Sequence, residues 1–165
     1  MNLDHLYDRY GEKMYHYLAL RLGSPEDAED VLQETFFRLA RISFRWPFVR
    51  NPRAFIFKIL RNEANRSLRR RISERREERN DPEAIQDAAL ANRLKGNRPE
   101  GDTAILIEKA LARLPEDQKE IVILKVFQEF TFKEIASLCG LSINTAASRY
   151  RYGIEKLRSD LEGKT

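Results

Sequence analysis

A single cysteine, Cys139, occurs among the 165 residues, so no disulfide can form within the chain and a reducing compartment suits it. Histidine is nearly as scarce, and we expect His5 and His16 to lie at the surface or the edge of a core rather than to bind a metal. There is no glycine-rich phosphate loop and no evident pair of nucleophile and base, so we expect neither catalysis nor a cofactor. No apolar run approaches the roughly 20 residues of a membrane span, and the N-terminus lacks the pattern of a signal peptide. We therefore expect a non-enzymatic protein of the cytoplasm.

Apolar residues recur at helical spacing almost throughout, and no segment alternates with period two for long enough to predict a sheet. Capping and breaking residues place the predicted helices at about residues 3–22, 25–41, 52–71, 103–113, 116–127, 132–139 and 143–161. Residues 72–101 break the pattern, because they contain two prolines, two glycines and many charges but few large apolar side chains. We interpret this stretch as a linker, with a short helix near residues 84–94. The sequence thus predicts an all-α fold with two small helical domains, residues 1–72 and 102–165, joined by a flexible linker over residues 73–101.

The charges are unevenly distributed along the chain, although the net charge is only +4. Residues 1–40 contain four Lys or Arg against eight Asp or Glu, a balance of −4, whereas residues 41–79 contain thirteen against four, a balance of +9. An acidic block followed by a basic block predicts two surfaces with different partners. The basic block can bind phosphate groups, and the acidic block is not expected to.

A helix-turn-helix is predicted over residues 131–149. Thr131 and Glu134 have the spacing of a capping box, and Gly140 follows the first helix, where a left-handed residue is needed. Ser142 is placed to cap the second helix, whose side chains can reach base edges and phosphates in the major groove. These candidate DNA-binding residues are Asn144, Thr145, Ser148, Arg149, Arg151 and Tyr152.

The predicted helix over residues 25–41 has an unusual outer face. Its core side is expected to be Ala28, Val31, Leu32, Thr35, Phe36 and Leu39. On the opposite side the large aromatic Phe37 lies beside acidic and amide groups, so either the following loop partly buries Phe37 or this ring anchors a basic partner helix. The acidic cluster at residues 26–30 could in principle hold a metal. Its position in the first turn of a helix explains it better, because acidic side chains there complement the helix dipole. The candidate partner-binding residues are Asp30, Gln33, Glu34 and Phe37.

The predicted helix over residues 52–71 is rich in cations. One face combines an aromatic ring, two amides and three cations, which can stack on bases, read base edges and bind phosphates: Phe55, Lys58, Asn62, Asn65, Arg66 and Arg69. A solvated charged face is the alternative, but the arginine run at residues 69–71, followed by Arg75 and Arg76, favours nucleic acid. The preceding loop, residues 45–48, contains Trp46 and forms either a pocket for an extruded base or a hydrophobic lid.

Two segments together resemble the sigma-70 family of bacterial RNA polymerase specificity subunits, and in particular its small extracytoplasmic-function (ECF) group. Residues 27–39, DAEDVLQETFFRL, with residues 51–64, NPRAFIFKILRNEA, are similar to region two of that family. Residues 111–121, LARLPEDQKEI, with the helix-turn-helix through Arg158, are similar to region four. The two segments cover about four fifths of the chain, and their order across a linker makes the resemblance highly specific.

The resemblance implies that region two binds the coiled-coil clamp helices of the polymerase largest subunit through Asp30, Gln33, Glu34 and Phe37. It implies that the third helix and the loop before it recognise and help to melt the −10 promoter element through Phe55, Lys58, Arg61, Asn62, Asn65 and Arg66. Region four would read the −35 element in the major groove and dock on the polymerase flap. The polymerase supplies the chemistry, so no catalytic residue, metal or cofactor is implied. Small members of this group are commonly held by an anti-sigma factor, and no membrane insertion is implied.

The chain departs from the family at three positions. Family members often have a branched apolar residue at the position of Ala146 and a basic one at that of Ala147, so a possible groove contact is lost here. Phe55 stands where Trp is frequent, which keeps the stacking surface but removes a hydrogen-bond donor.

Two other functions compete with a promoter-specificity subunit. One is a stand-alone regulator that binds DNA through the helix-turn-helix alone and dimerises through its N-terminal domain. The other is an enzyme acting on nucleic acid, for which the sequence offers no metal-ligand or nucleophile constellation. The charge asymmetry and the outer face of the helix over residues 25–41 favour the specificity subunit.

Overall fold

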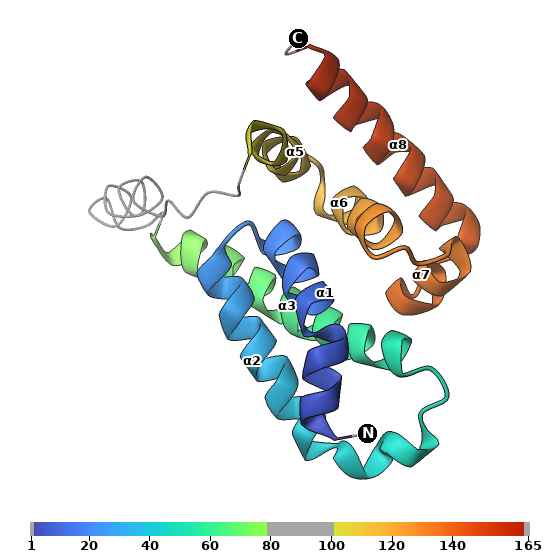
Figure 1. Ribbon diagram of the computed structural model, residues 1–165. Coiled ribbons are helices and arrows are strands. Elements are labelled where there is room, and N and C mark those ends of the chain that lie inside the picture. The colour runs from blue at the N-terminus through green and yellow to red at the C-terminus, as the bar shows by residue number, and fades with distance from the viewer. Residues whose placement is uncertain (1, 79–100, 164–165) are drawn as a thin grey trace.

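The computed structural model describes residues 2–78 and 101–163, and within these ranges the chain is helical and contains no strand (Figure 1). The N-terminal lobe, residues 2–78, consists of α1 (Leu3–Leu22), α2 (Pro25–Arg41), the 3₁₀ helix η1 (Ser43–Phe48) and α3 (Pro52–Glu78). The C-terminal lobe, residues 101–163, consists of α5 (Asp102–Ala112), α6 (Glu116–Val122), the π-helical turn η2 (Ile123–Phe127), α7 (Phe132–Cys139) and α8 (Ile143–Glu162). The predicted all-α fold class is confirmed. None of the helices in the described ranges has the length and apolar character needed to cross a bilayer.

The N-terminal lobe is a bundle in which α1, α2 and α3 each pack against the other two. Buried apolar side chains from all three helices form its core, among them Leu6, Met14, Leu18, Val31, Leu39, Ile56, Phe57 and Leu60. Of the core side predicted for α2, four residues are buried and two, Leu32 and Phe36, are half-buried. Thr35 satisfies its buried hydroxyl by donating to the carbonyl oxygen of Val31 at 2.7 Å.

The break between α1 and α2 follows from three consecutive residues. Gly23 adopts the left-handed conformation, with φ of +65°, and its N–H donates to the carbonyl oxygen of Ala19 at 2.9 Å. The Ser24 side chain then accepts a hydrogen bond from the Asp27 N–H at 3.3 Å, and Pro25 occupies the first helical position. The predicted cap is confirmed, and it fixes where the acidic first turn of α2 begins.

α3 is longer than the sequence pattern predicts, because it continues to Glu78. Residues 73–78, expected to belong to the linker, are therefore helical. The rest of the expected linker, including the short helix expected near residues 84–94, lies outside the described residues.

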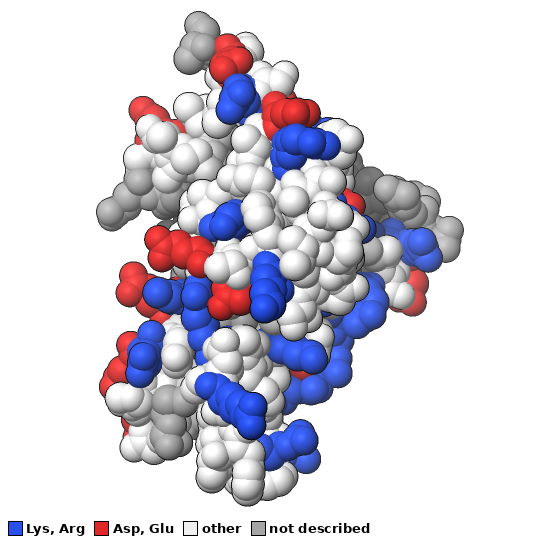
Figure 2. All heavy atoms as spheres, turned by 90° about the vertical axis from the view of Figure 1, so that its right-hand side faces the viewer, with Lys and Arg blue, Asp and Glu red and all other residues white. Residues whose placement is uncertain are grey.

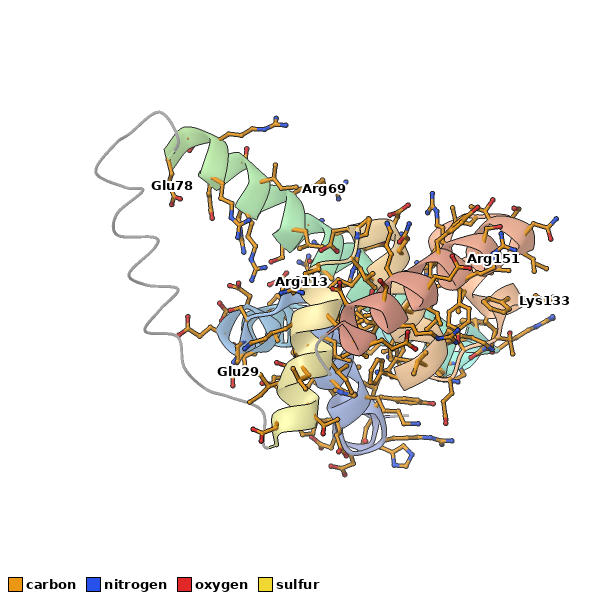
Figure 3. All side chains as sticks on the ribbon, turned by 90° about the horizontal axis from the view of Figure 1, so that it is seen from above. Glu29, Arg69, Glu78, Arg113, Lys133 and Arg151 are labelled. Carbon is orange, nitrogen blue, oxygen red and sulfur yellow. The ribbon has the colours of Figure 1, made fainter. Side chains whose placement is uncertain are left out.

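Arg71 anchors the second half of α3 to the junction between α1 and α2. Its guanidinium donates to the carbonyl oxygen of Leu22 at 2.7 Å and pairs with the carboxylate of Asp27. Beyond this anchor α3 extends away from the rest of the described molecule to Glu78, which Figure 3 labels at its end.

In the C-terminal lobe, α6 and α8 cross closely at Gly153. A Cβ atom at this position would lie 2.8 Å from Cγ2 of the buried Val122, so the absence of a side chain permits the crossing. The predicted helix over residues 116–127 is α-helical only as far as Val122, and η2 completes it as a π-helical turn. Glu129 follows with φ of +56°, and the chain turns directly into α7.

The two lobes pack against each other, with η2 and α5 against α1 and with α7 against α3 (Figure 1). The ring of Phe57 meets that of Phe130 edge-on at 5.1 Å between centroids, and His16 meets Phe127 in the same way at 5.6 Å. The guanidinium of Arg53 lies over the Phe130 ring at 3.9 Å. The sequence pattern predicts two domains but gives no sign of this interface between them.

Candidate nucleic-acid interface

The helix-turn-helix has the geometry that its sequence predicts. The Thr131 hydroxyl accepts from the Glu134 N–H at 3.2 Å, and the Thr131 N–H donates to the Glu134 carboxylate at 2.8 Å, which completes the capping box. Gly140 is left-handed, with φ of +67°, and Ser142 caps α8 by accepting from the Thr145 N–H at 3.0 Å. Each backbone turn is therefore fixed locally, and α8 is held in the position of a recognition helix.

The open face of α8 presents the six predicted −35 residues at the surface. Asn144, Arg151 and Tyr152 are exposed, while Thr145, Ser148 and Arg149 are partly exposed. Arg151 lies over the ring of Tyr152 at 5.2 Å, and in Figure 3 it projects at the same end of the molecule as Lys133 of α7. This face combines amides, hydroxyls and cations, the groups that read base edges and hold phosphates.

On the opposite side of α8, some residues are buried in the core and others are only half-buried. Ala146 is fully buried, Gly153 is buried at the α6 crossing, and Tyr150 packs edge-on against Phe132 at 5.4 Å. The small side chain of Ala146 thus lies in the closely packed centre of the helix-turn-helix, while Ala147 is half-buried.

The six predicted −10 residues of α3 do not share one environment. Lys58, Asn62 and Arg66 are exposed, and Arg66 pairs with the buried Glu63 at 3.5 Å. Glu63 also pairs with Arg38 of α2 at 2.8 Å, so this carboxylate ties two helices of the lobe together. The other three are partly buried: Phe55 lines a hollow beside η1, while Arg61 and Asn65 belong to a polar cluster between the lobes.

The hollow beside η1 has a volume of about 900 Å³ and is lined from both lobes. Phe55 forms one wall and packs edge-on against Trp46 at 5.8 Å between centroids. Lys58 and Lys133 line it as well, and Phe48 at its rim is 85% exposed. In η1 the rings of Phe44 and Phe48 are exposed, whereas Trp46 is half-buried against Phe55.

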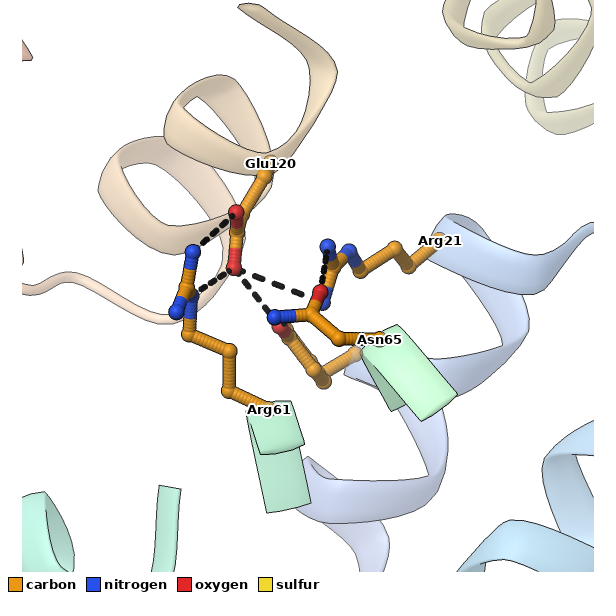
Figure 4. Close-up of polar contacts among 5 residues, drawn as sticks. Arg21, Arg61, Asn65 and Glu120 are labelled. Atoms are coloured by element: carbon orange, nitrogen blue, oxygen red, sulfur yellow. Dashed lines mark hydrogen bonds and ion pairs between the residues drawn. The ribbon is translucent and has the colours of Figure 1, made fainter. Parts of the chain in front are cut away.

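The interlobe polar cluster consists of Tyr17 and Arg21 of α1, Arg61 and Asn65 of α3, and Glu120 of α6. Glu120 is 5% exposed, and its carboxylate accepts from Arg61 Nε at 2.6 Å and from the Tyr17 hydroxyl at 3.2 Å. Arg21 lies 3.4 Å from the same carboxylate and donates to Asn65 Oδ1 at 2.6 Å. Figure 4 shows Glu120 reaching from its own helix towards Arg61 on one side and Arg21 on the other.

The sequence did not reveal Tyr17, Arg21 and Glu120 as functional candidates. Each lies in a helix whose local pattern explains it, and only the packing of the lobes brings them together. Asp117 was also missed: it pairs with Arg149 of the open α8 face at 3.4 Å.

The outer face of α2 is open to solvent. Asp30, Gln33 and Glu34 are exposed, and the ring of Phe37 is 63% exposed. The loop that follows α2 therefore leaves most of the Phe37 ring uncovered. This acidic face, with a free aromatic ring at its centre, has the character of a protein-binding surface.

Cations predominate over part of one face of the molecule. Figure 2 views the side that carries α7 and the start of α8, and Lys and Arg gather over its middle and lower right, while Asp and Glu lie towards the left and the top. A basic surface of this kind attracts nucleic acid through its phosphates.

Comparison with known proteins identifies the family to which the chain belongs. Residues 6–73 match the family model for Sigma-70 region 2, and residues 104–157 match that for Sigma-70, region 4. The chain is 36% identical to the ECF RNA polymerase sigma factor EcfG of Rhodopseudomonas palustris (strain TIE-1), over 82% of this chain and 71% of the relative. It is 24% identical to the ECF RNA polymerase sigma factor SigW of Bacillus subtilis (strain 168), over 93% and 86% of the two chains.

Two solved structures share the fold. The sigma factor RpoE in complex with the anti-sigma factor NepR from Bartonella quintana superposes with a TM-score of 0.78 at 22% identity, covering 96% of both chains. CnrH in complex with the cytosolic domain of CnrY superposes with a TM-score of 0.67 at 20% identity, covering 99% of this chain and 89% of the other.

The chain therefore belongs to the sigma-70 family of RNA polymerase sigma factors, in its ECF group. Its function is promoter-specific initiation of transcription, with core RNA polymerase and promoter DNA as partners. Sigma factors are initiation factors rather than enzymes, and the stand-alone regulator is not supported, since both region 2 and region 4 are present.

Proposed function

We propose that three surfaces of this sigma factor, on α2, on α3 with η1 and on α8, each bind a different partner or promoter element. The outer face of α2 binds the clamp helices of the polymerase largest subunit, α3 with η1 binds the −10 element, and the open face of α8 reads the −35 element. The protein acts in the cytoplasm and contributes no catalytic residue. The observation that carries the proposal is the exposure of Phe37 among acidic groups, because a large exposed ring beside acidic side chains suits a basic protein partner.

Support for the −10 assignment comes from the hollow beside η1. An unpaired base needs an aromatic wall and a neighbouring cation, and Phe55 with Lys58 offers both at the rim of a cavity larger than one base. The exposed Asn62 lies one turn further along α3 and can reach a base edge or a sugar. This arrangement suits a single strand whose bases have left the duplex.

Support for docking on the polymerase flap comes from a second hollow, of about 430 Å³, between α5, η2 and α8. Its lining is almost entirely apolar and includes Ile107, Leu111 and Ile154. Val126 at its edge is 46% exposed, so an apolar helix of the polymerase can bury it.

We further propose that an anti-sigma factor binds this chain. The sigma factor RpoE, which shares the fold, was solved in complex with the anti-sigma factor NepR, and CnrH, which also shares it, was solved with the cytosolic domain of CnrY.

The proposed function is tested by pull-down with bacterial core polymerase and by run-off transcription on genomic DNA fragments. We expect stable association and new start sites, from whose upstream sequences both promoter elements can be read. Specific binding of duplex DNA by the protein alone, with no association with polymerase, would contradict the proposal.

A further inference from the structure

Four of the five residues of the interlobe polar cluster belong to the N-terminal lobe, and we call these four, Tyr17, Arg21, Arg61 and Asn65, the cradle. Only Glu120 comes from the C-terminal lobe. One carboxylate thus lies between two guanidinium groups, at 2.6 Å from Arg61 and 3.4 Å from Arg21. Two guanidinium groups face one carboxylate, so the cluster has one positive charge in excess. The cradle is therefore a cationic site that the Glu120 side chain occupies.

The cradle is oriented by its own lobe. Arg21 donates to the Tyr17 hydroxyl at 2.9 Å and to Asn65 Oδ1 at 2.6 Å, and both acceptors lie in α1 or α3. Burial raises the pKa of the Tyr17 hydroxyl far above its ordinary range, so this group keeps its proton and can donate to an anion. Neither hydrogen bond of Arg21 involves Glu120, so contacts within the N-terminal lobe hold Tyr17, Arg21 and Asn65 together, whereas Arg61 is paired with Glu120.

Glu120 does not satisfy all the hydrogen-bond donors of the Arg21 guanidinium. Its side chain is only 4% exposed, and its Nε atom has no hydrogen-bond partner among the described residues. A guanidinium held in so enclosed a place needs an anion, since an unpaired charge there is costly.

We propose that the cradle binds a backbone phosphate of promoter DNA and that Glu120 occupies the same site in the closed arrangement of the lobes. The carboxylate is thus a stand-in for a phosphodiester, which carries the same single charge and which arginine binds through paired N–H donors. The inference rests on the proposed function of α3, because Arg61 and Asn65 lie on the same helix as Lys58 and Asn62. It adds Arg21 and Tyr17 of α1 to the DNA-binding surface.

The closed arrangement then excludes DNA from the cradle. Glu120 and a phosphate cannot share the two guanidinium groups, so each must displace the other. The free protein is therefore a weak binder of single-stranded DNA, and any partner that parts the lobes exposes the cradle. Promoter binding and the packing of α6 on α1 and α3 are coupled through this one carboxylate.

The test is fluorescence anisotropy of the full chain with a short fluorescein-labelled single strand of mixed sequence, over a series of salt concentrations. Glu120→Gln removes the charge but keeps the shape, and we expect it to bind several-fold more tightly than the wild type. Adding Arg21→Gln to this variant should abolish the gain and reduce the slope of log affinity against log salt by about 0.7, the value for one lost phosphate contact on a single strand. Equal affinity and slope with and without Arg21→Gln would overturn the inference.

Arg9→Gln in the Glu120→Gln background is the matched control, because Arg9 is an exposed arginine of the same helix outside the cradle. Circular dichroism shows whether each variant is folded, and Arg61→Gln replaces Arg21→Gln if the latter melts below the assay temperature.

Lys58→Ala in the same background separates the inference from the proposed function. If Lys58→Ala weakens binding and Arg21→Gln does not, the cradle is wrong and the −10 face of α3 stands. If only Arg21→Gln weakens binding, the cradle is right and Lys58 does not belong to the −10 face.

Discussion

Arg149 of the recognition helix is held by Asp117 of α6, with 3.4 Å between Nε and the carboxylate. Both side chains are partly exposed, so the pair is weak in water. The pair matters for orientation rather than stability, because it positions the Arg149 guanidinium on the open face of α8 before DNA binds.

Replacing Arg149 with Ala should lower the affinity for promoter DNA by about 1–3 kcal/mol, the usual contribution of an arginine that reads a base. Gel shift or anisotropy with the −35 duplex measures it, and Lys156→Ala, an exposed cation further along α8, is the control. A loss of equal size on every DNA sequence would mean that Arg149 contacts phosphate only.

Asp117→Asn should have the opposite effect on total affinity. It removes a negative charge beside the DNA face and frees Arg149, so binding to all duplexes should strengthen while the ratio between matched and mismatched −35 sequences falls. Binding to a panel of single-base substitutions checks this. An unchanged ratio would show that Asp117 does not position Arg149.

The double substitution Gln33→Ala with Glu34→Ala should weaken binding to core polymerase and leave the fold intact. Both side chains are exposed, and among the described residues the ion pair lost is that of Glu34 with Arg38, an exposed pair worth about 0.3–0.5 kcal/mol. Co-elution with core polymerase and thermal melting measure the two effects, and Glu74→Ala on α3 is the control. Unchanged polymerase affinity would count against the outer face of α2 as the binding surface.

Gly153→Ala should destabilise the C-terminal lobe by about 1–3 kcal/mol, the usual cost of overpacking. Alanine is favoured in helices by up to about 1 kcal/mol, but here its Cβ would lie 2.8 Å from the stiff, buried Val122 side chain. Urea unfolding measures the loss, and adding Val122→Ala should recover part of it by making room. A more stable Gly153→Ala variant would show that α6 and α8 move apart freely.

Cys139, the only cysteine, should react slowly with iodoacetamide while the lobes are closed. Burial, with the nearby charge of Glu120, raises the pKa of its thiol to about 11, so little thiolate is present at neutral pH. Below that pKa the labelling rate should rise about tenfold per pH unit, because the thiolate is the reactive form. Glu120→Gln should accelerate labelling at fixed pH, and mass spectrometry follows it. A rate equal to that of a free thiol in the wild type would argue against a closed interface.

The elements that the sequence predicted well are those whose signals are local. The capping box at Thr131, the left-handed Gly140 and the cap at Ser142 each act within a few residues, so the helix-turn-helix could be placed from the sequence alone. The same holds for the break at Gly23. The π-helical end of α6 has no such signal, since its residues also suit an ordinary α-helix.

The packing of the lobes could not be predicted, because it depends on side chains far apart in the chain. In the sequence Glu120 has the appearance of a surface residue on a charged helix, and Arg21 that of a cation in the last turn of α1, where it complements the helix dipole. Their burial arises only when α6 lies against α1 and α3. The contact between the two lobes was therefore hidden from the sequence, while the surfaces for polymerase and DNA were predicted from residue patterns and stay predictions.

The anchoring of α3 by Arg71 makes its last turns a stiff arm. Seven further residues continue the helix from Arg71 to Glu78, a length of about 10 Å at the rise of an α-helix. The chain thus leaves the N-terminal lobe from a fixed point and in a fixed direction. A sigma factor binds two promoter elements at once. Because the end of α3 is fixed on the N-terminal lobe, it limits the spacings between these elements that the second lobe can span.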